Sequence, residues 1–90
     1  MIKKQLKVIN KTGLHARPAS ELVLKAKKFE SKVTIRNLDQ DKEAVNAKSV
    51  VRIMAEGLKQ GTRIEIAADG SDEENAVEEL CALVESGFGE

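Results

Sequence analysis

The spacing of hydrophobic residues changes several times along this chain. Alternating polar and apolar positions over residues 4–8, 32–36 and 62–68 predict three strands. Apolar residues at helical spacing over residues 16–28, 49–58 and 71–86 predict three amphipathic helices. A polar turn over 37–42, followed by a short strand around 43–45, would complete a hairpin. The predicted order is β-α-β-β-α-β-α, and the S-x-x-E spacing of Ser71 and Glu74 predicts a capping box at the start of the last helix.

These elements predict an α+β fold. Four strands with one apolar face need a cover, and three helices with single apolar stripes provide it. We therefore expect an open-faced β-sandwich, with a four-stranded antiparallel sheet, three helices on one face and the other face open to water. Ninety residues correspond to a single domain, residues 1–90.

Composition narrows the classes of function. Fifteen basic and fifteen acidic residues cancel, and tyrosine and tryptophan are absent, which argues against a nucleic-acid-binding protein. Cys81 is the single cysteine, so we expect no internal disulfide, a cytoplasmic location and a small buried side chain at that position. The sequence shows no signal-peptide pattern and no apolar run long enough to insert into a membrane. The acidic residues show no metal-ligand pattern, so neither a metal nor another cofactor is expected.

His15 is the only histidine, and it lies where a strand pattern gives way to a helix pattern. The N–H groups at the start of a helix lack partners and favour an anion. A neutral imidazole has a free lone pair and is a nucleophile, so His15 is a candidate phosphate acceptor. The backbone N–H groups of Ala16 and Arg17 would bond the phosphate oxygens, and the Arg17 guanidinium, outside the apolar stripe, would add a charge-assisted contact. Taken alone, this pattern also fits a solvated histidine in a loop.

Residues 12–19 (Thr-Gly-Leu-His-Ala-Arg-Pro-Ala) resemble the active-site signature of the HPr family. These proteins are the histidine-containing phosphocarriers of the bacterial phosphoenolpyruvate-dependent phosphotransferase system. The resemblance extends through the element order, residues 45–49 (Val-Asn-Ala-Lys-Ser) and residues 85–90 (Glu-Ser-Gly-Phe-Gly-Glu). It implies that His15 accepts a phosphoryl group from phospho-Enzyme I and passes it to Enzyme IIA proteins in sugar uptake, assisted by Arg17. It implies a monomeric carrier that is a substrate of Enzyme I and not an independent enzyme.

Ser49 is a second candidate site. By residue type it suits the N-cap of the second helix. In Gram-positive members of the family the matching serine is phosphorylated by an ATP-dependent HPr kinase/phosphorylase, and the resemblance suggests a transcriptional regulator as a further partner. Arg52 departs from the pattern, because many of these members have a glycine there.

The apolar residues after Ser49 are candidates for partner docking: Val50, Val51 and Met54. The spacing of Val50 and Met54 also fits two core residues, which would leave Val51 exposed off the stripe.

Two other functions stay open at this point. One is an NPr-type carrier of the nitrogen-related branch, favoured by Arg36-Asn37 before an acidic turn and by residues 85–88, whereas Lys48-Ser49 favours the sugar branch. The other is a regulatory binding module whose histidine is never phosphorylated. Relatives of that kind are expected to lack the histidine, which this chain has.

Overall fold

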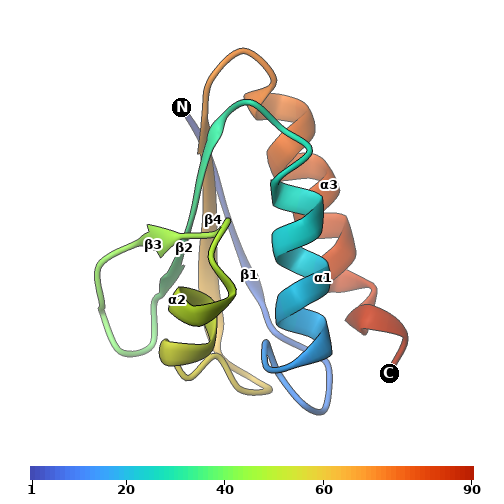
Figure 1. Ribbon diagram of the computed structural model, residues 1–90. Helices are drawn as coiled ribbons and strands as arrows, with labels where there is room; N and C mark the ends of the chain where they lie inside the picture. The colour runs from blue at the N-terminus through green and yellow to red at the C-terminus, as the bar shows by residue number, and fades with distance from the viewer.

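The computed structural model describes residues 1–90 and confirms the predicted order of elements (Figure 1). The short 3-10 turn η1 follows the last helix. Element ends differ from the predicted ones by a few residues, most clearly in the second helix, which is only six residues long. The elements are β1 (Ile2–Lys7), α1 (Arg17–Ala26), β2 (Lys32–Asn37), β3 (Val45–Asn46), α2 (Val50–Ala55), β4 (Arg63–Asp69), α3 (Glu73–Glu85) and η1 (Gly87–Gly89).

The four strands form one antiparallel sheet in the order β1-β4-β2-β3. Ile66 of β4 lies opposite both Lys4 of β1 and Ile35 of β2, so β4 is paired along both edges. Helices α1 and α3 run side by side on one side of the sheet, and α2 packs against α1 and next to β3 (Figure 1). The predicted open-faced sandwich is therefore confirmed.

The core lies between the sheet and the helices. Alternate residues of the central strands point into it and are fully buried, because the period of two places them all on one face. They pack with the apolar stripes of the helices, and the largest of these side chains are Leu22, Val33, Ile35, Ile53, Ile64, Ile66, Leu80 and Val84. No helix is both long and apolar enough to cross a bilayer.

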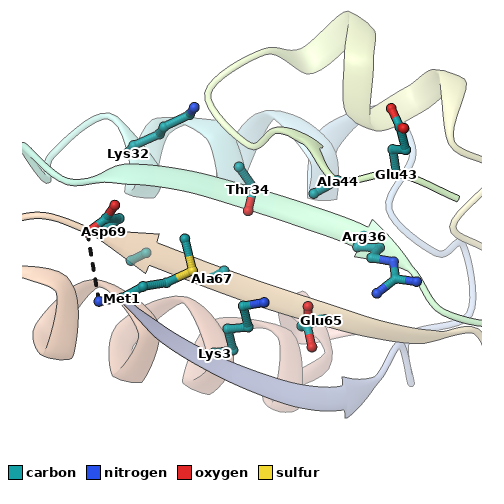
Figure 2. Close-up of a pocket in the computed structure, with 11 residues that line it drawn as sticks. Met1, Lys3, Lys32, Thr34, Arg36, Glu43, Ala44, Glu65, Ala67 and Asp69 are labelled. Carbon is teal, nitrogen blue, oxygen red and sulfur yellow. Dashed lines mark ion pairs between the residues drawn. The ribbon is translucent and has the colours of Figure 1, made fainter.

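The opposite face of the sheet carries charged and small side chains (Figure 2). Lys3, Arg36 and Glu65 stand on three neighbouring strands, around a shallow hollow of about 410 Å³ above Ala67. The N-terminal ammonium of Met1 lies 3.8 Å from a carboxylate oxygen of Asp69 at one end of the hollow. Polar side chains on this face match the expectation that it meets water.

The predicted capping box of α3 is wrong. The helix begins at Glu73, and the Ser71 hydroxyl instead donates to Glu30 at 3.3 Å. Asp72 accepts hydrogen bonds from the N–H groups of Glu30 (2.9 Å) and Ser31 (3.0 Å) and from the Ser31 hydroxyl. The hydrogen bond from the Ser31 hydroxyl contributes most to lowering the pKa of Asp72 below its usual value, and the bond from the Glu30 N–H contributes next. Asp72 therefore binds the residues just before β2, and the local contact at this helix end is the Gly70 N–H donating to Glu73 at 3.1 Å instead of the predicted pair.

Cys81 is buried in the core face of α3, as expected. Burial raises the pKa of its thiol to about 11, so the reactive thiolate is scarce at neutral pH. This cysteine fills space in the core.

Candidate functional site

His15 lies in the loop between β1 and α1, with its side chain exposed two residues before the helix begins. The residue before it, Leu14, is buried in the core. The Leu14 N–H donates to the carbonyl oxygen of Leu58, 2.8 Å away, in the segment that follows α2. An exposed imidazole is thus attached directly to a buried anchor, which fixes the position of the histidine backbone.

Gly13 makes this anchor possible. Its φ is +70°, and a Cβ there would lie 2.5 Å from the Leu58 carbonyl oxygen and 2.8 Å from the Lys59 Cα. The buried Asn10 holds the other side of the loop, because its Nδ2 donates to the Gly13 carbonyl at 2.8 Å. The close approach of two backbone segments therefore requires glycine at position 13.

Ala16 turns the chain into α1 with φ +52° and ψ −118°, a conformation that residues with a side chain rarely adopt. Such a residue costs about 1–3 kcal/mol and persists because the surrounding contacts hold it. The N–H groups of Ala16, Arg17 and Ala19 donate no hydrogen bond within the chain, and Pro18 has no N–H. Free donors and the positive end of the helix thus meet beside His15, where they favour an oxyanion.

Arg17 is the first residue of α1, and its side chain is exposed outside the buried stripe, as predicted. Its Nε lies 3.9 Å from a carboxylate oxygen of Glu21, one turn along the helix. The Arg17 guanidinium is therefore already close to a carboxylate, which the sequence analysis did not predict. An exposed ion pair of this kind contributes little, so the guanidinium can turn toward an anion at low cost.

A small hollow of about 250 Å³ connects His15 with the end of α2. The side chain of Lys59 contributes a positive charge to the lining of this hollow, and Thr12 contributes a hydroxyl group. Lys59 was not predicted from the sequence, because it lies 44 positions away from His15 and no local pattern relates the two. The lining residues are Thr12, Leu14, His15, Met54, Gly57, Leu58 and Lys59.

The three candidate docking residues do not share one environment. Val51 is 77% exposed and Met54 is 36% exposed, whereas Val50 is half-buried against the core. The alternative that Met54 is a core residue is wrong, because α2 ends at Ala55 and only Ile53 of this helix is fully buried. Val51 and Met54, which we call the α2 patch, are thus the accessible apolar side chains of the helix.

Ser49 caps α2 as predicted: its Oγ accepts a hydrogen bond from the Arg52 N–H at 3.3 Å. Its side chain is half-buried. No cluster of three or more histidine, cysteine, aspartate or glutamate side chains has the geometry of a metal site.

Fold and site together define a class: a small open-faced sandwich with one exposed histidine beside free backbone donors. The sequence profile described as "PTS HPr component phosphorylation site" matches residues 2–86. The chain therefore belongs to the HPr family, the phosphocarriers of the phosphotransferase system, which confirms the resemblance seen in the sequence.

Similar proteins agree with this membership. The chain is 40% identical to the phosphocarrier protein HPr of Haemophilus influenzae, over 93% of this chain and 95% of that protein. It is 46% identical, over 90% of its length, to the multiphosphoryl transfer protein of the same organism, but it spans only 16% of that longer protein. The crystal structure of HPr-C-His from Thermoanaerobacter tengcongensis has a TM-score of 0.93 at 44% identity, covering 100% of this chain and 98% of that one. These relatives do not favour the nitrogen-related alternative.

The close contact at Gly13 can be tested with two alanine substitutions. Gly13 and Gly57 have φ values of +70° and +65°, but a Cβ at Gly57 would meet nothing within 4 Å. Gly13→Ala and Gly57→Ala therefore impose similar backbone strain, and only the first adds a clash. We expect Gly13→Ala to lower the free energy of unfolding by about 1–3 kcal/mol more than Gly57→Ala in denaturant titrations. Equal losses would contradict the proposed contact.

Proposed function

We propose that this chain carries phosphoryl groups on His15, which it accepts from phospho-Enzyme I and delivers to Enzyme IIA proteins in phosphoenolpyruvate-dependent sugar uptake. The observation that carries the proposal is the exposed imidazole beside three unpaired N–H groups at the start of α1. Family membership supports it. In this proposal residues 1–90 act as one carrier domain.

The transfer step needs no group beyond those on the two proteins. A ring nitrogen of His15 donates its lone pair to the phosphorus, and an N–P bond forms while the bond to the donor atom breaks and that atom keeps its electron pair. The phosphoryl oxygens then accept from the free N–H groups of Ala16, Arg17 and Ala19 and from the Arg17 guanidinium. Because Arg17 is exposed, this support is moderate, and the group can leave again by the reverse step to an acceptor.

In this role the partner protein catalyses the transfer, and this chain supplies the surface that the partner recognises. The α2 patch offers apolar contacts next to the hollow beside His15, and we propose that Enzyme I and Enzyme IIA proteins dock there in turn. We propose that this chain acts as a cytoplasmic monomer. It would serve as a substrate of Enzyme I, without catalysis of its own and without a cofactor.

We further infer that phosphorylation of Ser49 by an HPr kinase/phosphorylase would regulate this exchange. The Ser49 hydroxyl caps α2, directly before the α2 patch. A phosphate there would gain from the first turn of the helix but would place about two negative charges beside the surface that partners approach. A transcriptional regulator that recognises the modified form would be a further partner.

Phosphorylation of His15 is tested with labelled phosphoenolpyruvate and Enzyme I. Wild type should take up one phosphoryl group that is labile in acid and stable in alkali, as P–N bonds are. His15→Ala should take up none and keep its thermal midpoint, because an exposed side chain contributes little to stability. Acid-labile label on His15→Ala would refute the assignment of this residue.

Two substitutions at Ser49 separate charge from capping. Aspartate is also a good N-cap, so Ser49→Asp should keep the stability of the fold and slow the transfer from Enzyme I. Ser49→Ala should accept phosphate at the wild-type rate but lose about 1 kcal/mol of stability with the cap. Initial rates of phosphorylation and denaturant titrations measure both effects. Equal initial rates for Ser49→Asp and wild type would leave Ser49 with a structural role alone.

A further inference from the structure

Lys59 brings an unpaired positive charge to the hollow beside His15. It lies in the segment after α2, at the same end of the molecule as the loop before α1 (Figure 1). Its side chain is exposed and takes part in none of the ion pairs of the chain. None of the residues that line the hollow is acidic, so no carboxylate in its wall neutralises the ammonium group.

The backbone of Lys59 is fixed close to His15. A Cβ at Gly13 would lie 2.8 Å from the Lys59 Cα, so the two backbone segments are in contact. The Lys59 N–H donates to the Gly57 carbonyl at 2.9 Å, and the Lys59 carbonyl accepts from the Thr62 N–H at 3.1 Å. His15 follows Gly13 by two residues, which span at most about 7 Å. The four-carbon stem of lysine is long enough to cover such a distance, so the ammonium group can reach an anion bonded to the imidazole.

The hollow gives Lys59 access to His15 from the side of α2, whereas the free N–H groups lie at the start of α1. A phosphoryl group has three oxygens, and donors on one side of it leave an oxygen directed to the other side. Leu14 and Leu58 are buried and give the hollow an apolar wall. Apolar surroundings strengthen the attraction between opposite charges, so a cation in this hollow acts on a phosphoryl oxygen more strongly than one in open water.

We propose that Lys59 is a second cation for the phosphoryl group on His15, with its ammonium group donating to a phosphoryl oxygen that faces the hollow. The inference rests on the proposed function of His15. Arg17 lies 3.9 Å from a carboxylate oxygen of Glu21, whereas Lys59 has no carboxylate partner. Lys59 therefore makes the phosphorylated form of this chain more stable relative to phosphorylated Enzyme I.

The test compares Lys59→Gln with wild type in the equilibrium of labelled phosphoryl groups between Enzyme I and this chain. Contacts that exist only in the complex change the rates in both directions and leave this equilibrium unmoved, so it reports on the phosphorylated chain itself. We expect Lys59→Gln to shift the equilibrium away from the phosphorylated chain by roughly threefold, the effect of one exposed ion pair. Lys59→Arg keeps the charge and should retain the wild-type equilibrium.

Lys28→Gln is the matched control. It removes one positive charge from an exposed position beyond the far end of α1 that makes no ion pair, and it should leave the equilibrium unchanged. The effect of Lys59→Gln should nearly vanish at about 1 M salt, where charges are screened within about 3 Å.

Two results would overturn the role of Lys59 and leave the carrier function intact. One is an equal equilibrium for Lys59→Gln and wild type, even with slower transfer, because the lysine would then contact the partner and not the phosphoryl group. The other is a difference that persists at high salt. A wild-type chain that takes up no label would overturn the proposed function of His15 as well.

Discussion

The site depends on one backbone contact, the approach of residues 13 and 14 to residues 58 and 59. The Leu14 N–H to Leu58 carbonyl hydrogen bond joins the loop before α1 to the segment after α2, and both leucine side chains are buried. The contact therefore sets the position of His15 relative to α1, which carries the free donors, and to α2, which carries the exposed Val51 and Met54. A shift of this contact would move His15 away from the free N–H groups at the start of α1 or away from the α2 patch.

The groups around His15 are arranged so that they would stabilise a bound anion only moderately. A phosphoryl carrier has to bind its group and then release it, so a deep and fully satisfied site would oppose its function. Here the unpaired N–H groups are at a solvent-exposed helix end, Arg17 shares its charge with Glu21, and Ala16 keeps an unfavourable conformation. Each feature is small in energy, and together they describe a site that stabilises an anion without enclosing it.

Sequence patterns predicted the parts of this molecule that depend on local order. The alternation of Ile64 and Ile66 in β4 and the apolar stripe of α1 identified elements because burial imposes a period of two or 3.6. The position of His15 before a helix and the cap at Ser49 followed from the same local logic. The sequence also identified the family, since residues 12–19 form a specific motif.

What the sequence did not predict depends on contacts between distant segments. The capping box at Ser71 failed because the polar residues before α3 bind Glu30 and Ser31, which precede β2. Met54 was ambiguous because nothing local shows that α2 stops after six residues. Glu90, which binds Thr12, and Lys59, which lines the hollow beside His15, reach these positions only through the folded chain, and no pattern in the residues next to them predicts it.

The central claim is that the start of α1 is ready to receive a phosphoryl group on His15. The most direct measurement is a comparison of backbone amide proton signals before and after phosphorylation at neutral pH. New hydrogen bonds to phosphoryl oxygens should move the signals of Ala16, Arg17 and Ala19 strongly downfield, while those of Val50 and Val51, in the first turn of α2, change little. Changes confined to His15, with Ala16, Arg17 and Ala19 unmoved, would contradict the account.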